Sequence, residues 1–359
     1  MEKANRQKSE NTEKKTYRIA IDAMGGDFAP SNEIQGAISA CSELKNNFDV
    51  EIVFVGKETK IRSTLSHYDC ANMKFSIINA DEVVTMHDDP SAALKKKKNS
   101  SLYKGLQMHA NGYVDAFISV GNTGAVLSTS TVLLGRINGV SRPTIGSFFP
   151  TTSGHPSILL DVGANIDVKP RYLYEFAVMG SIYASNFLGL ENPRVSLLNI
   201  GEEKSKGTKI VQETYTMLED SHLNFIGNIE GRDLLIGSSD VIVCDGFSGN
   251  IILKFAESIP GFLKTMIKAY SAKCFLNKFK ILLLLPLLKS VLSGLDYEEY
   301  GGVPLLGVNG SVIIGHGKST PKAIHKMITE AVTLVRNDVN GKIETALNPE
   351  VKKENKVNK

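Results

Sequence analysis

The sequence predicts an α/β protein built around a mostly parallel β-sheet. Short runs rich in Val, Ile and Phe end in glycine-bearing turns and alternate with helical patterns along the chain. This alternation is typical of βαβ units, in which helices join parallel strands. Several runs are apolar at nearly every position, which indicates strands that are buried on both faces. We expect strands at residues 18–22, 50–55, 75–78, 116–120, 157–161, 195–200, 241–245 and 311–314.

The clearest helix is expected at residues 321–335, where Pro321 stands at the first position and apolar residues recur on one stripe. The length of 359 residues allows one large or two moderate domains. We expect a disordered basic tail at 1–16, a single catalytic domain at 17–338 and a mobile basic tail at 339–359. A lysine-rich helical hairpin at 260–295 is expected to be inserted in that domain.

The composition excludes several classes of protein. A net charge of +3, 42% hydrophobic and 22% charged residues are those of a globular chain, not of a disordered, collagenous or disulfide-rich one. Four dispersed cysteines with no C-x-x-C pair argue against structural zinc and for reduced intracellular thiols. Basic residues are not gathered with aromatics as in nucleic-acid binders. The polar first fifteen residues lack the apolar core of a signal peptide, so we expect a cytoplasmic protein.

Glycine-rich turns follow most of the expected strands and carry the main functional signal. Because parallel strands end at one edge of a sheet, we expect these turns to converge on one crevice. Glycine lets the backbone approach a ligand, and the helix that follows directs its positive end there, which favours an anion such as phosphate. A single glycine turn after a strand is common in α/β proteins and does not indicate a ligand, but several together favour a shared site. They are AMGGD (23–27), GNTGA (121–125), VGAN (162–165), GEEKSKG (201–207), DGFSGN (245–250), YGGVPLLGVNG (300–310) and GHGKS (315–319).

Known nucleotide and hydrolase motifs do not fit these turns. The turn after the first strand lacks the G-x-G-x-x-G spacing, and GHGKS has Val312 where a P-loop requires its first glycine. Residues 246–250 approach G-x-S-x-G, but Asn250 replaces the last glycine. We therefore expect no NAD, ATP or serine-hydrolase chemistry and no cofactor.

Charged residues near the turns leave alternatives open. Asp22, Asp161 and Asp245 end strands, where helix capping is commoner than catalysis; a divalent cation ranks behind an anion, and we expect no metal. The run Lys95 to Lys98 is either a phosphate contact near a helix start or a solvated stretch. His316 is either a ligand contact or a structural histidine. Arg142, Lys206 and Lys254 are the further cationic candidates.

Residues 260–295 are apolar beyond an ordinary surface helix and carry six lysines with no acidic residue. The uncharged run 281–288 covers roughly 12 Å as a helix, far short of a bilayer core. The segment either lies on an anionic membrane surface, with its lysines snorkelling, or forms a buried dimerisation hairpin. The absence of acidic residues favours the membrane.

Colinear motifs extend from about residue 18 to 335. Besides the turns above they include KKKKNSSL (95–102), RPTIG (142–146), PRVSLLNI (193–200) and NFIGNIEGRD (224–233). Together they resemble the bacterial acyl-[acyl-carrier-protein]:phosphate acyltransferase family of phospholipid synthesis. The departures are Val120, where the family commonly has Ala, and Asn99, where it often has Asp.

This resemblance implies that a long-chain acyl group moves from acyl carrier protein to inorganic phosphate, giving acyl phosphate. It also implies a three-layer αβα sandwich like those of phosphotransacetylases and isocitrate-type dehydrogenases, a homodimer, and peripheral membrane association at the inner face of the cell membrane. Acyl phosphate would feed a membrane glycerol-3-phosphate acyltransferase. A phosphotransacetylase acting on short acyl-CoA and an idle membrane-recruited scaffold are the alternatives.

Phosphate is itself a nucleophile, so the site must neutralise charge, orient the thioester and stabilise an oxyanion. The residues that we assign to catalysis are Asn122, Thr123, Lys206, Asp245, Asn250 and His316. Those that we assign to substrate or phosphate binding are Gly25, Gly26, Asp27, Lys97, Lys98, Ser100, Ser101, Gly121, Gly124, Arg142, Asp161, Asn165, Gly246, Ser248, Gly249 and Lys254. Those that we assign to membrane contact are Lys278, Phe279, Lys280, Leu282, Leu283, Leu284, Leu285, Leu287, Leu288 and Lys289.

Overall fold

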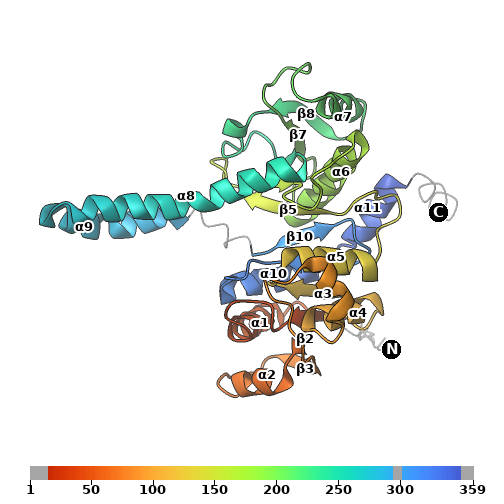
Figure 1. Cartoon of the computed structure of the whole chain (residues 1–359), viewed down its shortest axis with the longest axis vertical. Helices are drawn as coiled ribbons and strands as arrows, with labels where there is room; N and C mark the ends of the chain where they lie inside the picture. Colours follow the sequence, from red (N-terminus) through yellow and green to blue (C-terminus); the bar gives the residue numbers. More distant parts are fainter. Residues whose placement is uncertain (1–14, 294–300, 349–359) are drawn as a thin grey trace, which may run out of the picture.

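The computed structural model describes residues 15–293 and 301–348 and contains one eleven-stranded sheet (Figure 1). Its order is β3-β2-β1-β4-β11-β10-β5-β6-β9-β7-β8. The strands are β1 (Thr16–Asp22), β2 (Asp49–Gly56), β3 (Lys74–Asn79), β4 (Ala116–Ser119), β5 (Thr144–Phe149), β6 (Ser157–Leu160), β7 (Arg194–Leu198), β8 (Asn224–Ile229), β9 (Val241–Val243), β10 (Val303–Leu306) and β11 (Ser311–Ile314).

Helices cover both faces of this sheet. One apolar core lies between the sheet and α1, α2, α6, α7, α10 and α11, and a second lies between the opposite face and α3, α4, α5 and the first turns of α8. The predicted three-layer αβα sandwich is therefore confirmed. The helices are α1 (Ser31–Leu44), α2 (Glu58–Leu65), α3 (Pro90–Lys96), α4 (Ser101–Ala110), α5 (Thr123–Leu133), α6 (Pro170–Phe187), α7 (Lys209–Glu219), α8 (Gly246–Ala272), α9 (Phe275–Ser293), α10 (Pro321–Arg336) and α11 (Val339–Leu347), with a 3-10 turn η1 (Gly231–Asp233).

The sheet is mostly parallel, as predicted, but its direction reverses in the middle. The pairings β11–β10, β10–β5 and β5–β6 are antiparallel, while β3-β2-β1-β4-β11 and β6-β9-β7-β8 are parallel groups. Three reversals leave the two groups running in opposite directions. The expectation that all glycine turns lie at one edge of the sheet is therefore wrong, since the turns after β1 and β4 and those after β6 and β9 lie at opposite ends of the strand direction.

Three strands were not expected from the sequence, and each contains a residue that disfavours strands. Gly146 lies in β5, Gly227 in β8 and Pro304 in β10. Glycine offers no side chain to pack, and proline cannot donate to a ladder, so a pattern based on Val, Ile and Phe misses such strands. Pairing with neighbouring strands overrides both local preferences here.

The predicted lysine-rich hairpin is formed by α8 and α9, which project together from the body of the molecule (Figure 1). Its first helix begins earlier than residue 260, because Pro260 is accommodated inside the 27-residue α8. Large apolar side chains of the hairpin are exposed, for example Phe262 at 63% and Phe275 at 82%. None of the described helices combines the length and the apolar character needed to cross a bilayer.

The expected C-terminal tail is corrected at its start. Residues 339–347 form α11, whose Val339 and Ile343 are buried in the core that α6 also covers. Two apolar residues four positions apart lie on one face of a helix, which is enough to dock this short segment. The remainder of this predicted tail, and nearly all of the predicted N-terminal tail, lie outside the described residues.

Candidate active site

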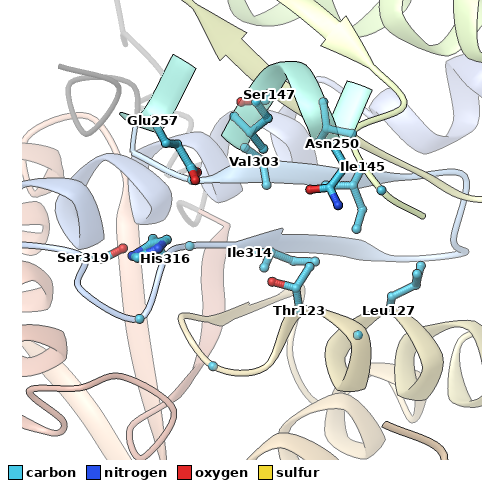
Figure 2. A pocket seen from close by; sticks show the side chains of 18 of the residues that line it. Thr123, Leu127, Ile145, Ser147, Asn250, Glu257, Val303, Ile314, His316 and Ser319 are labelled. Carbon is cyan, nitrogen blue, oxygen red and sulfur yellow. The ribbon is translucent and has the colours of Figure 1, made fainter. Parts of the chain in front are cut away.

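A cavity of about 490 Å³ lies over the central strands β11, β10 and β5, between α5 and α8. It receives the turn after β4, the turn after β6, the first turns of α8 and the turn after β11. Asn250 and Glu257 on the α8 side face Thr123 and His316 on the other side (Figure 2). The two strand groups thus meet over the face of the sheet rather than along one edge.

The N-terminus of α5 opens into this cavity. Thr123 and Gly124 are its first two helical residues and both line the cavity, as does Gly121. The first N–H groups of a helix have no partner within the helix and carry its positive end, so this is a suitable place for an anion. Gly121 and Gly124 were assigned to binding and Thr123 to catalysis, and these assignments stay predictions.

Asn122 is the N-cap of α5 and does not line the cavity. Its Oδ1 accepts the N–H of Ala125 at 3.0 Å, and its Nδ2 donates to the carbonyl oxygens of Asp88 at 3.0 Å and Thr85 at 3.2 Å. The predicted catalytic amide is therefore engaged in holding the 85–88 loop, which places Met86 at the cavity wall. Asn122 thus joins α5 to the 85–88 loop, and its catalytic role stays a prediction.

The lysine run 95–98 has a similar supporting position outside the cavity lining. Lys97 Nζ donates to Asp88 Oδ2 at 2.7 Å and to the Val83 carbonyl at 2.8 Å. The hydrogen bond from Lys97 lowers the pKa of Asp88 to about 2. Lys95, Lys96 and Lys98 are exposed, which fits the solvated interpretation of this run.

The AMGGD turn is built on a buried carboxylate beside the cavity. Asp22 accepts from the Ser119 hydroxyl at 2.9 Å and from the Met24 N–H at 3.1 Å, and Ser101 also hydrogen-bonds to it. Burial raises the pKa of Asp22 above its usual value. Ser100, also predicted at this site, is the N-cap of α4. The two glycines of the turn are closely packed: a Cβ on Gly25 would stand 2.9 Å from the Gly121 nitrogen, and a Cβ on Gly26 would stand 2.6 Å from a Glu33 oxygen.

The next residue, Asp27, donates its backbone N–H to the Gly317 carbonyl at 2.8 Å. This bond joins the turn after β1 to the turn after β11. Asp27, Ser100, Ser101, Gly25 and Gly26 therefore support the cavity wall and are not among its lining residues.

Asp161 organises the VGAN turn. Its Oδ1 accepts N–H groups of Gly163 at 3.1 Å and Ala164 at 3.0 Å, and its Oδ2 accepts the backbone N–H of Asn165 at 2.7 Å and its side-chain Nδ2 at 2.8 Å. This carboxylate is fully buried. Asp161 and Asn165 thus hold the backbone that places Gly163 in the cavity wall, and they do not reach into the cavity themselves.

The DGFSGN turn shows why its glycines are required. Asp245 caps α8, accepting from the Ser248 N–H and hydroxyl, both at 2.8 Å, so the capping alternative holds for this residue. A Cβ on Gly249 would stand 1.9 Å from the Asp161 carbonyl oxygen, and one on Gly246 would stand 2.7 Å from the Asn165 carbonyl oxygen. This close packing of α8 against the VGAN turn directs Asn250 into the cavity.

Besides Thr123, three predicted polar residues line the cavity and remain available to a ligand: Asn250, Lys254 and His316. Among the described residues, Asn250 and Lys254 have no side-chain hydrogen bond or ion pair. The backbone N–H of Lys318 donates to His316 Nδ1 at 3.2 Å. In a neutral ring this bond assigns the proton to Nε2, which can then donate to a ligand.

Two predicted cations lie elsewhere. Arg142 is exposed before β5, and Lys206 lies in the turn after β7, where its carbonyl accepts from Asn199 Nδ2 at 3.1 Å. Neither lines the cavity. Lys206 stays outside it because β7 is separated from the central strands by β6 and β9. Both assignments remain untested predictions.

Sequence reasoning missed Met86, Ser147, Glu257 and Ser319 in the cavity wall. It also missed Glu33, which is 1% exposed and whose Oε2 has no hydrogen-bond partner among the described residues. Burial raises the pKa of Glu33 to about 8. Glu33 is the third residue of α1, where an acidic side chain is common, so the sequence around it does not indicate that it is buried. The described residues also contain no cluster of three or more His, Cys, Asp or Glu side chains arranged for a metal ion.

Fold and cavity together define an α/β protein with a cleft over the centre of its sheet, into which the N-terminus of α5 opens. Residues 17–342 match the family described as "Fatty acid synthesis protein". The chain is 45% identical over 332 residues to a phosphate acyltransferase of Dictyoglomus turgidum, covering 92% of this chain and 98% of that protein. It is 43% identical over 333 residues to a phosphate acyltransferase of Halothermothrix orenii, with shares of 92% and 98%. The chain therefore belongs to the fatty acid synthesis family that contains the phosphate acyltransferases.

A solved structure adds to the fold assignment. A phosphotransacetylase from Streptococcus pyogenes superimposes with a TM-score of 0.59 at 17% identity, covering 90% of this chain and 94% of that one. This likeness concerns the fold, which matches the expected similarity to phosphotransacetylases.

Proposed function

We propose that this protein transfers a long-chain fatty acyl group from the thioester of acyl carrier protein to inorganic phosphate, forming acyl phosphate for phospholipid synthesis. Its family makes it an acyltransferase of fatty acid and phospholipid synthesis. The observation that carries the proposal is the cavity in which the free N-terminus of α5 faces Asn250, Lys254 and His316. A helix N-terminus beside a lysine suits a phosphate dianion.

The reaction needs positioning and charge stabilisation more than a protein nucleophile. A phosphate oxygen attacks the thioester carbonyl carbon, the C–S bond breaks, and the sulfur leaves as a thiol after taking a proton. Thr123 and Gly124 N–H groups with Lys254 would hold phosphate, and the Asn250 amide would donate to the developing oxyanion. The proton of hydrogen phosphate would pass to the departing sulfur, and His316 Nε2–H would donate a hydrogen bond to that sulfur as the C–S bond breaks.

The carrier protein would dock on the lysines of α8. Lys264 and Lys268 are one turn apart, and Lys254 precedes Lys268 by fourteen residues, about four turns, so the three share one side of the helix. None of them forms an ion pair with the described residues. This side continues from the cavity mouth along the free part of α8, where it would attract an acidic carrier protein.

Lys95 and Lys96, which are exposed on α3, are the second candidate site for docking of the carrier protein. Exchange of Lys264 and Lys268 for Glu is expected to raise the carrier-protein KM about tenfold, while exchange of Lys95 and Lys96 leaves it within about twofold. Steady-state kinetics at two salt concentrations measures both. A larger effect of the α3 pair would transfer the docking site to α3.

The exposed apolar side chains of α9 would contact the inner face of the cell membrane. Leu282, Leu283 and Leu284 are 65%, 67% and 47% exposed, and Lys278 and Lys280 flank them. Phe279, Leu285 and Leu287 are exposed on the same helix, whereas the side chains of Leu288 and Lys289 lie outside the described residues. Apolar residues with flanking lysines favour an anionic interface.

We also propose that the protein forms a homodimer and delivers acyl phosphate to a membrane acyltransferase. In the alternative arrangement, the hairpin is buried between the two subunits of that dimer and does not contact the membrane. Replacing Leu283 and Leu284 with Glu is expected to abolish co-sedimentation with vesicles that contain anionic lipid. Light scattering of the same variant reads the oligomeric state. Retained vesicle binding together with loss of the dimer would assign the hairpin to the subunit interface.

The activity itself is tested with purified protein, palmitoyl-carrier protein and labelled phosphate, with hydroxylamine trapping of acyl phosphate. Product that requires both substrates supports the proposal. Product with acetyl-CoA but none with the carrier thioester would make the protein a phosphotransacetylase. No product with either would favour a scaffold without catalysis.

A further inference from the structure

A second, apolar groove of about 50 Å³ adjoins the cavity. Phe148, Leu253 and Glu257 line both spaces, so the groove lies directly beside the cavity. Apart from Glu257 at the junction, its wall is apolar and comes from the end of β5, the turn after η1 and one side of α8. The other lining residues are Phe149, Pro150, Leu235, Ala256, Ile259 and Pro260.

The α8 wall of the groove follows the helix away from the cavity. Leu253, Ala256 and Pro260 are spaced by three and four residues, so they lie on one face. Pro260 follows Leu253 by seven positions, which correspond to about 10 Å of helix. The later part of α8 leaves the body of the molecule and continues with α9 as the exposed hairpin (Figure 1). The groove therefore leads from the cavity toward the base of the hairpin.

We infer that this groove holds the first methylenes of the acyl chain and directs the rest of the chain toward the hairpin. The inference rests on the proposed function and specifies how that site selects a long chain. Phosphate and the thioester need polar groups, whereas the acyl chain needs apolar surface, since leaving its methylenes in water forfeits their burial.

Filling the groove should penalise long chains selectively. Each methylene kept out of an apolar site lowers kcat/KM roughly fourfold. Displacing two or three methylenes should therefore lower kcat/KM for a palmitoyl thioester about 15- to 60-fold. An acetyl group ends before the groove, so its transfer should change less than about twofold.

Leu235→Trp is the test variant and Ile236→Trp its control. The two residues are neighbours in the same turn, both are apolar and both are partly exposed, at 40% and 54%, but only Leu235 lines the groove. Ala256→Trp fills the groove from its other wall and gives a second, independent variant. Acetyl and palmitoyl groups are both presented on the same carrier protein, so docking is identical in the two assays.

A selective loss of palmitoyl transfer in Leu235→Trp and Ala256→Trp, absent in Ile236→Trp, supports the inference. Equal losses of kcat/KM for the palmitoyl and acetyl thioesters would assign the groove to the thioester-bearing arm of the carrier protein. An unchanged kcat/KM for both would show that the groove binds no part of the substrate. Either result overturns the inference. A wild-type protein that is inactive with both thioesters would instead refute the proposed function.

Discussion

Replacing Glu33 with Gln is expected to stabilise the protein at alkaline pH and to change its stability little below pH 4. Glu33 is 1% exposed in α1, its Oε2 has no partner among the described residues, and burial followed by the nearby Asp22 charge raises its pKa from 4.5 to about 8. The folded state thus holds a proton that the unfolded state loses near pH 4.5. Stability falls as pH rises from about 4.5 to about 8 and levels off above that range.

The magnitude follows from the same values. A difference of one in pKa corresponds to about 1.4 kcal/mol, so the rise from 4.5 to about 8 sets a ceiling of about 5 kcal/mol on the destabilisation by ionised Glu33. Relaxation and water entry screen a buried charge, and we expect Glu33→Gln to gain about 2–3 kcal/mol at pH 9 relative to its effect at pH 4.

Urea unfolding followed by circular dichroism between pH 4 and 9 measures this difference. The chain contains no Trp, so circular dichroism is the appropriate signal. Glu330→Gln is the companion variant, because burial also raises the pKa of Glu330 to about 8, against a hydrogen bond from Tyr183. If wild type and Glu33→Gln lose stability in parallel from pH 5 to 9, Glu33 is not protonated in the folded protein and the reasoning is refuted.

Other expectations follow from the cavity and its supports. Asn250→Ala should lower kcat about 100-fold with unchanged unfolding, as for loss of one oxyanion donor; an unchanged kcat would remove Asn250 from the reaction. His316→Ala should slow turnover about 100-fold, and a leaving group that needs no proton should restore the rate. Gly249→Ala should lower the free energy of unfolding by at least about 3 kcal/mol, because its Cβ would stand 1.9 Å from the Asp161 carbonyl oxygen. Gly261→Ala is the control in the same helix: its Cβ meets nothing within 4 Å, so the free energy of unfolding should rise by up to about 1 kcal/mol. Equal unfolding midpoints of the two glycine variants would contradict the packing argument.

Local patterns in the sequence determined the class of fold and most of its elements. The strand at 311–314 has the bounds of β11, and the helix at 321–335 falls one residue short of α10. These segments combine strand or helix propensity with periodic burial, so local preference and tertiary environment agree. The apolar, lysine-rich hairpin was likewise visible from composition alone.

Long-range pairing decided what the sequence left open. Nothing in the residues of β10 or β5 announces that they run against their neighbours, yet those reversals determine that the turns after β4, β6 and β11 meet at one cavity while the turn holding Lys206 stays outside it. Partners were equally hidden: Lys97 is matched to Asp88, and the amide of Asn122 is used to hold a loop. The sequence by itself determined the glycine turns, helix starts and strands and the polar groups that they carry, because a few neighbouring residues specify each of them. Which of those groups remain free to meet a substrate was decided only by the tertiary structure, because burial and hydrogen-bond partners depend on contacts between residues far apart in the chain.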